Sequence, residues 1–228
     1  MHKVEVIITK DGSSSLFVPS LDETYHSRHG AITESVHVYI QHGLYERVES
    51  ANLSTVDIFE VGFGTGLNTL LTILACLKRD ITLNYTTIEP FPLDKATLDK
   101  LNYHSLLSQP EANDWFNWLH NTEWDQIQSR GKISFIKTKD RLETFHTEKK
   151  FEIVYFDAFA PEKQPELWKP EIYKKIYSMM NESGVLTTYC AKGQVKRDLL
   201  MAGFMVENLP GPPGKREIIR ATRPPQNS

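Results

Sequence analysis

Apolar and polar residues follow two different periods along this chain, and the change of period marks the expected elements. Val4, Val6 and Ile8 alternate with polar residues, which indicates one or two edge strands within residues 1–20. Residues 31–50 instead place apolar residues near one face at helical spacing, which predicts a helix. The chain therefore begins with short strands followed by a helix.

From residue 56 onward, strand-like and helix-like segments alternate, which is typical of an α/β domain with a parallel sheet. The candidate strands are 56–61, 82–88, 132–136, 151–156 and 184–189. The helical candidates are 66–78, 93–101, a stretch around 110–129, 169–180 and 193–202. Two further strand-like segments, 203–209 and 217–221, flank a Pro/Gly-rich turn and predict a closing hairpin.

This order of elements predicts an α/β fold of the Rossmann-like S-adenosylmethionine (SAM)-dependent methyltransferase type. We expect a mostly parallel seven-stranded sheet with a closing antiparallel C-terminal hairpin. A dinucleotide-binding fold would be expected to continue with another βαβ half. We expect residues 1–228 to form a single domain. Its parts are an N-terminal extension (1–50), a SAM-binding core (51–222) and a helical insertion around 94–130.

Composition narrows the class of protein further. The 228 residues are 40% hydrophobic and 24% charged, as in an ordinary globular domain. No run approaches the roughly 18 apolar residues of a membrane span, and the N-terminus lacks the apolar core of a signal peptide. Cys76 and Cys190 have no metal-binding spacing, so we expect buried free thiols in a reducing cytoplasm and no contact with membranes.

Charge is unevenly distributed along the chain. The net charge is −3, but residues 190–228 contain seven basic and three acidic side chains, so they carry +4 and the rest carries −7. A basic segment on an acidic body could hold a phosphate backbone. A solvated helix face followed by a frayed end explains the same composition equally well.

The glycine-rich segment 58–68, Ile-Phe-Glu-Val-Gly-Phe-Gly-Thr-Gly-Leu-Asn, carries the strongest candidate chemistry. Gly62, Gly64 and Gly66 let the backbone turn off a strand and approach a ligand closely. A dinucleotide site would read G-x-G-x-x-G, so the third glycine comes one position early here. The preceding Glu60 would repel a pyrophosphate but suits the cationic methionine end of SAM. A tight turn without a ligand is the alternative.

Three acidic residues follow candidate strands, where they would face the ligand crevice of an open α/β sheet. Glu89 comes 23 positions after Gly66, near the spacing at which an acid accepts hydrogen bonds from ribose hydroxyls. Asp140 could accept a hydrogen bond from an adenine amino group, or cap the next helix. We predict both as cofactor ligands.

Asp157 ends a fully apolar strand and is followed by Ala-Phe-Ala-Pro. A buried carboxylate is costly unless it is paired or hydrogen-bonded, and such acids are candidates for functional residues. If SAM occupies the glycine loop, Asp157 lies where methyl group and acceptor meet. It could orient an amine and take its proton, while aromatic walls such as Phe159 exclude water. A turn-capping Asp is the alternative.

Two other features carry weaker signals. Four histidines crowd residues 26–42, but their spacing matches no metal site that we would assign. The polar segment 25–35 could fold over the pocket and contact substrate or cofactor. Trp115, Trp118 and Trp124 are most simply interpreted as core packing of the helical insertion.

The chain resembles the MnmC-type tRNA wobble-uridine methyltransferases in their stand-alone form. The resemblance rests on H-G-A-I-T-E-S at 29–35, the loop at 59–68, D-A-F-A-P at 157–161, P-E-L-W at 165–168 and G-K-R-E at 214–217. These motifs are spread over most of the chain. The D-A-F-A-P with its following P-E-L-W is more specific than any glycine loop.

The resemblance implies methyl transfer from SAM to the primary amine of 5-aminomethyl-2-thiouridine at the wobble position of tRNA. It implies that the glycine loop, including Asn68, and Glu89 hold SAM, and that Asp157 lies near the acceptor amine. Lys215 and Arg216 become candidate phosphate contacts, and Glu34 matches the family's loop without an assigned role. The partner is tRNA, bound at its anticodon region.

Larger members of the family add a FAD-dependent oxidase domain. Since this chain ends at Ser228, we expect it to lack that activity and to depend on a separate FAD oxidase or aminomethyl-forming enzymes upstream.

Two other functions remain open at this point, and a third is rejected. A polyamine or small-molecule amine transferase could use the same sheet and an adenosyl donor, although the basic hairpin fits a polycationic substrate poorly. A non-catalytic tRNA-binding module would have no use for a buried Asp157 beside the cofactor. An NAD-dependent dehydrogenase is rejected on glycine spacing and on the closing hairpin.

Overall fold

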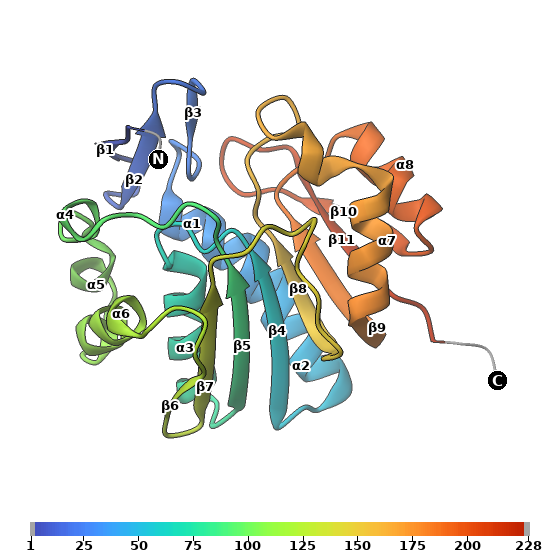
Figure 1. Cartoon of the computed structure of the whole chain (residues 1–228), viewed down its shortest axis with the longest axis horizontal. Helices are drawn as coiled ribbons and strands as arrows, with labels where there is room; N and C mark the ends of the chain where they lie inside the picture. Colours follow the sequence, from blue (N-terminus) through green and yellow to red (C-terminus); the bar gives the residue numbers. More distant parts are fainter. Residues whose placement is uncertain (1–2, 226–228) are drawn as a thin grey trace.

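An eight-stranded mixed sheet forms the centre of the computed structural model, which describes residues 3–225 (Figure 1). Its strands lie in the order β10-β11-β9-β8-β4-β5-β7-β6. They are β4 (Thr55–Val61), β5 (Thr82–Ile88), β6 (Gln128–Arg130), β7 (Ile133–Thr138), β8 (Phe151–Phe156), β9 (Met180–Thr188), β10 (Met205–Pro210) and β11 (Glu217–Thr222). The five strands from β9 to β7 are parallel, and β11 pairs antiparallel with both β9 and β10. The expected fold class and closing hairpin are confirmed.

The strand count differs from the expected seven because β6 adds a short antiparallel edge beyond β7. Its first two residues fall in the stretch around 110–129 for which the sequence predicted a helix. That helix ends at Asn121, and the chain then turns at Gly131 (φ 59°) into β7. A glycine with positive φ suits the tight connection between two antiparallel strands.

Helices cover both faces of the sheet. They are α1 (Ala31–Ser35), the π-helix η1 (Val36–Tyr45), α2 (Glu46–Ala51), α3 (Leu67–Lys78), α4 (Lys95–Leu98), α5 (Tyr103–Leu106), α6 (Ala112–Asn121), the 3-10 helix η2 (Pro165–Trp168), α7 (Pro170–Met179) and α8 (Gly193–Met201). None of the helices within residues 3–225 is long and apolar enough to span a lipid bilayer.

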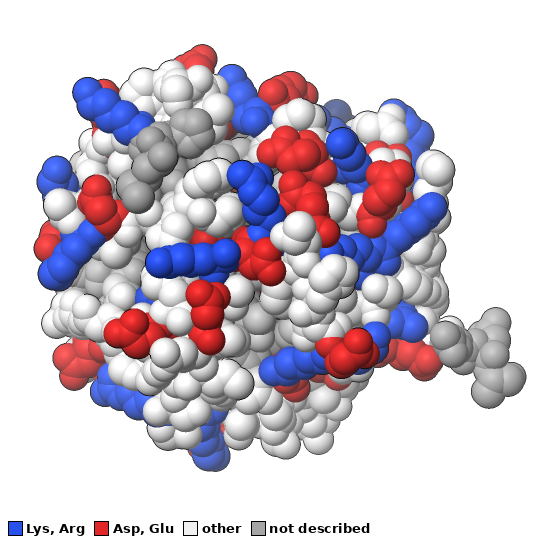
Figure 2. Space-filling view, viewed as in Figure 1, with Lys and Arg blue, Asp and Glu red and all other residues white. Residues whose placement is uncertain are grey.

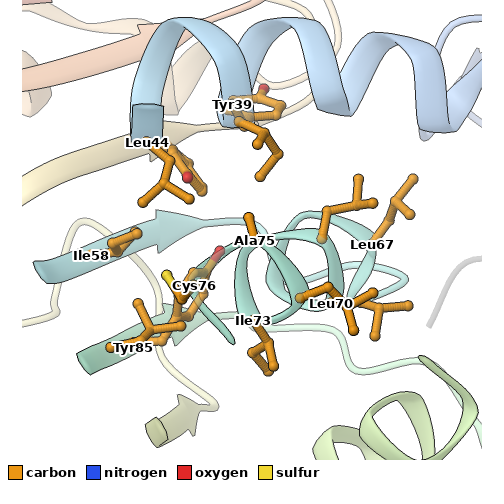
Figure 3. Close-up of a cluster of buried hydrophobic side chains, with 14 of the residues drawn as sticks. Tyr39, Leu44, Ile58, Leu67, Leu70, Ile73, Ala75, Cys76 and Tyr85 are labelled. Carbon is orange, nitrogen blue, oxygen red and sulfur yellow. The ribbon is translucent and has the colours of Figure 1, made fainter. Parts of the chain in front are cut away.

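Alternating strand residues feed two hydrophobic clusters, one on each face of the sheet. In β4, Ile58 packs with η1 and α3, whereas its neighbour Phe59 packs on the side of α7 and α8. Figure 3 shows Tyr39 and Leu44 of η1 above the α3 side chains, with Ile58 and Tyr85 of the sheet beside them. This two-sided packing fixes the strand ends that carry the site.

The N-terminal segment forms a separate three-stranded sheet of β1 (Glu5–Ile8), β2 (Ser14–Val18) and β3 (Glu23–Thr24). It lies beside the carboxyl ends of β4 and β5 in Figure 1. The expected helix 31–50 is present as α1, η1 and α2 in succession, but its middle is wound as a π-helix. Such segments are frequent at functional sites.

Candidate functional site

A cavity of about 300 Å³ opens at the carboxyl ends of the parallel strands. The chain runs from β4 outward to β5 and β7, then returns to β8 and β9 on the other side of β4. The crevice at such a reversal is the expected ligand site of an open α/β sheet. Segments from the N-terminal sheet, the glycine loop, the turns after β5 and β8, and the closing hairpin line it.

The glycine loop approaches its neighbours too closely for side chains at two positions. Gly62 has φ 90°, and an added Cβ would lie 2.8 Å from the carbonyl oxygen of Asp157. Gly64 has φ 49°, and its Cβ would lie 3.1 Å from the Tyr25 ring. Both line the cavity, so the backbone itself forms part of the wall. The positive φ angles agree with the predicted turn off β4, and contact of this turn with a ligand stays a prediction.

Glu89 joins the glycine loop to the turn after β5. Its Oε2 accepts a hydrogen bond from the Gly64 amide at 3.0 Å, and its Oε1 accepts one from the Phe91 amide at 2.9 Å. Burial raises the pKa of Glu89, while the two amide donors oppose that shift. The carboxylate lines the cavity with its lone pairs partly available, as a ribose ligand requires.

Asp157 and Asn68 meet at the wall formed by the ends of β8 and α3. The Asn68 Nδ2 donates to Asp157 Oδ2 at 2.8 Å, and both residues line the cavity. Burial raises the pKa of Asp157 to about 6, against the lowering effects of the Tyr39 hydroxyl, Asn68 and Lys215. The side chain is therefore mostly ionised at pH 7 and able to accept a proton.

Glu60 lies beneath this pair rather than in the cavity wall. It is fully buried, and Thr69 Oγ1 donates to its Oε2 at 3.1 Å. Burial raises its pKa to about 8, while hydrogen bonding from Thr87, Thr69 and Asn68 opposes the rise. Glu60 is thus mostly neutral at pH 7 and supports Asn68 from below.

Glu34 and Lys215 form an ion pair in the cavity wall, joining α1 to the loop of the closing hairpin. The Lys215 Nζ lies 2.5 Å from Glu34 Oε1, while Glu34 Oε2 accepts the Ser27 amide at 2.7 Å. The Lys215 ammonium also lies 3.8 Å from the centre of the Tyr189 ring. Both charges are paired, as burial of a carboxylate and an ammonium requires.

Aromatic side chains surround the acidic end of the cavity. Tyr25 and Phe159 pack edge to face with ring centres 5.1 Å apart, and Tyr189 donates from its hydroxyl to the Ala158 carbonyl at 2.8 Å. The Phe159 carbonyl accepts the Trp168 indole N–H at 2.7 Å. The P-E-L-W segment therefore holds the D-A-F-A-P turn in place.

Besides Glu60, three of the sequence-predicted residues lie outside the cavity wall. An added Cβ at Gly66 would lie 2.9 Å from Leu119, so this glycine lets α3 pack against α6. The Asp140 carboxylate accepts hydrogen bonds from the Arg141 amide and the Thr144 hydroxyl, both at 2.7 Å, so it stabilises the turn after β7, where residues 139–150 form no helix for it to cap. The Arg216 side chain is 93% exposed and its nearest charged neighbour is Glu217.

Sequence reasoning missed two tyrosines of the site. Tyr39 is buried in η1 and its hydroxyl lowers the pKa of Asp157, yet it lies within an apolar helical pattern. Tyr189 directly follows β9 at the same edge of the sheet as Asp157. Tyr189 could have been predicted as a site residue because it directly follows a strand, as Asp157 does. Nothing in the local pattern distinguished Tyr39 from a core residue.

Comparison with known proteins gives two agreeing results on sequence. A family model described as S-adenosyl-L-methionine-dependent methyltransferase matches residues 105–224. The chain is 29% identical over 96% of its length to the tRNA 5-methylaminomethyl-2-thiouridine biosynthesis bifunctional protein MnmC of Hydrogenovibrio crunogenus. It is 30% identical over 94% of its length to the protein of the same name from Burkholderia thailandensis. It spans about a third of the length of each, 34%.

Among solved structures, MNMC2 from Aquifex aeolicus superposes with a TM-score of 0.83. The match covers 100% of this chain and 74% of the other, at 23% sequence identity. At that identity the likeness concerns the fold, including the mixed sheet with its antiparallel hairpin.

Proposed function

The chain belongs to the family of S-adenosyl-L-methionine-dependent methyltransferases, and on that premise we propose that it methylates a primary amine on the wobble uridine of tRNA. The acceptor is 5-aminomethyl-2-thiouridine and the product 5-methylaminomethyl-2-thiouridine. The relatives whose name contains this product support the choice of acceptor. Enzymes that form the aminomethyl group, including a FAD-dependent oxidase, would act earlier, in the same cytoplasm.

The observation that carries the proposal is the Asp157–Asn68 pair in the wall of an aromatic-lined cavity, next to the glycine loop. An ionised carboxylate without a cationic partner of its own suits an ammonium or amine ligand.

The residues present fit S-adenosyl-L-methionine. Gly62 and Gly64 line the cavity without side chains of their own, and the Glu89 carboxylate in the same wall offers acceptors for ribose hydroxyls. We assign Gly62, Gly64 and Glu89 to direct contact, and Gly66 to the packing of α3 that supports the loop. When bound, the cofactor supplies an electrophilic methyl group.

Asp157 then acts on the amine. A free alkylamine is mostly protonated at pH 7, and its nitrogen needs a lone pair to form the new N–C bond. The ionised Asp157 attracts the ammonium, accepts its proton and orients the remaining N–H groups. Asn68 fixes the carboxylate by its 2.8 Å hydrogen bond, and Glu60 supports Asn68, so both are positioning residues. The proton leaves to solvent through the open side of the cavity.

The experiment is mass spectrometry of nucleosides from tRNA bearing 5-aminomethyl-2-thiouridine, after incubation with the protein and SAM. We expect a gain of one methyl group on that nucleoside. Asp157→Asn should lower the rate about 10²- to 10⁴-fold while SAM affinity stays within a few-fold. The wild-type rate should fall as pH drops through about 6, because Asp157 becomes protonated and can no longer accept a proton.

If wild-type protein binds SAM but the nucleoside gains no methyl group, the proposed acceptor is wrong. Loss of SAM binding in Asp157→Asn would make Asp157 a structural residue instead.

A further inference from the structure

Lys215 is part of the cavity wall and is turned away from bulk solvent. Its side chain is 27% exposed, against 93% for the adjacent Arg216. Lys215 lines the cavity together with Asp157, Tyr189 and Glu34, whereas Arg216 does not line it. Two neighbouring cations therefore point to different surroundings, one into the site and one into solvent.

The loop that carries Lys215 is held in one conformation. The Gly211 amide donates to the Arg216 carbonyl at 3.0 Å, and the Lys215 amide donates to the Pro212 carbonyl at 2.9 Å. Gly214 has φ 87°, and an added Cβ there would overlap the His29 ring. Reaching out to a phosphate would require Lys215 to leave Glu34 and the Tyr189 ring, which is costly for a paired, half-buried charge.

The ammonium retains donor capacity for a ligand. It has three N–H groups and forms an ion pair with Glu34 Oε1 at 2.5 Å, while the face of Tyr189 supports the charge at 3.8 Å. Its charge also reaches Asp157, whose pKa it lowers. The wall of the cavity thus presents a hydrogen-bond acceptor, Asp157, near a charged donor, Lys215.

This pairing complements one edge of the acceptor base. In a 5-aminomethyluridine, the amine on the C5 substituent lies next to the carbonyl oxygen on C4, so a donor and an acceptor stand side by side. Asp157 matches the amine, and a nearby ammonium matches the carbonyl. In the corresponding cytidine, an amino group replaces the C4 oxygen and would face the ammonium donor to donor.

We propose that Lys215 donates a hydrogen bond to the C4 carbonyl oxygen of the acceptor base, and thereby selects uridine over cytidine. This inference rests on the proposed function, and it replaces the phosphate contact that the sequence indicated for Lys215. Glu34 is then a positioning residue that holds the ammonium toward the base. Arg216 stays available for phosphate.

The test uses two anticodon stem-loop RNAs that differ only at the wobble base, 5-aminomethyluridine or 5-aminomethylcytidine. Their dissociation constants are measured in the presence of S-adenosylhomocysteine, at several salt concentrations. We expect wild-type protein to prefer the uridine RNA about 10- to 100-fold, because a lost hydrogen bond to a charged group is worth about that much. In Lys215→Met the preference should fall to within about 3-fold.

Arg216→Met is the matched control. It should keep the base preference but reduce the slope of log affinity against log salt by about 0.7 to 0.9, as loss of one phosphate contact does. Because Lys215→Met leaves Glu34 buried without a partner, the double variant Glu34→Gln/Lys215→Met is measured as well. The melting temperature of each variant reports on its fold, and the double variant should also lose the base preference.

Three results would overturn the inference. The first is an unchanged base preference in Lys215→Met together with a reduced salt slope, which describes a phosphate contact. The second is a wild-type protein without base preference. The third is a tenfold or greater loss of SAM affinity in both Lys215 variants, which would place the ammonium at the donor's carboxylate. In each of these three cases, methylation of the aminomethyl nucleoside by wild-type protein would still support the proposed function. Failure of the inference on Lys215 can therefore be distinguished from failure of the proposed function.

Discussion

At the scale of single residues, the site contains two buried acids, and burial raises the pKa of one more than that of the other. Asp157, in the cavity wall, has a pKa of about 6, whereas Glu60, directly beneath, has a pKa of about 8. At neutral pH one is mostly charged and the other mostly neutral, so two adjacent carboxyl groups have separate roles. In the proposed reaction the proton acceptor is Asp157, the one of the two that lines the cavity.

Glu60→Gln tests whether the buried acid is neutral. Its folded-state pKa is raised from 4.5, so the stability that its protonated form contributes is complete below about pH 4.5 and is lost as pH rises through about 8. Wild-type protein should lose a few kcal/mol of unfolding free energy over this range, because each tenfold change in proton affinity corresponds to about 1.4 kcal/mol. The amide mimics the neutral acid, so the variant should lose less.

Urea unfolding at pH 5, 7 and 9 measures the effect, with SAM affinity at pH 7 as a control for the fold. Parallel pH profiles of wild type and Glu60→Gln would contradict the assignment.

At the scale of elements, one buried lysine attaches the inserted helices to the sheet. Lys137 of β7 is 1% exposed, and its Nζ donates to the carbonyls of Leu119 and His120 at 2.8 and 2.9 Å. Burial lowers its pKa to about 8, so it remains mostly charged at pH 7. These carbonyls belong to the last turn of α6, where backbone acceptors are unpaired and a cation is favourable.

Replacing Lys137 by Met keeps most of its volume but removes the donor from two buried carbonyls. We expect a loss of about 2 to 4 kcal/mol in unfolding free energy, measured by urea denaturation at pH 7. Lys139→Met, at the next exposed position after β7, is the matched control and should change stability by less than about 0.5 kcal/mol. Equal effects of the two substitutions would show that Lys137 acts only as part of the surface charge.

The elements also show what the sequence could predict. The predicted bounds of β4 and β5 are within one residue of the observed ones. Each strand is an apolar run with a clear end, at Gly62 for β4 and at Glu89 for β5. The helix 110–129 was predicted too long, since no Gly or Pro marks Asn121 as its end. The contacts of Lys137 and of the Glu34–Lys215 pair join residues distant in sequence, so no local pattern encodes them.

At the scale of the whole molecule, charge is mixed rather than segregated. Figure 2 shows Lys and Arg side chains interspersed with Asp and Glu over one face. Several basic residues in α8 or directly before it form pairs with neighbouring side chains, as Lys192 does with Glu162. A chain of net charge −3 can hold RNA only through local cations, so the affinity must depend strongly on salt.

Simultaneous replacement of Lys192, Lys196 and Arg197 by Gln tests this segment. We expect weaker tRNA binding and a slope of log affinity against log salt that is smaller by up to about 3, because each phosphate contact contributes nearly one unit. SAM affinity should be unchanged, since none of the three lines the cavity. A slope equal to that of the wild type would place the RNA on another face.

The ion pair between Glu34 and Lys215 also has a consequence for folding during synthesis on the ribosome. Most of the chain lies between these two residues, so a ribosome must synthesise the central sheet before the second partner emerges. The glycine loop and Glu89 are available much earlier. A nascent chain can therefore form the side of the cavity at the glycine loop first, and completes the wall at Lys215 only when the last hairpin folds back against α1.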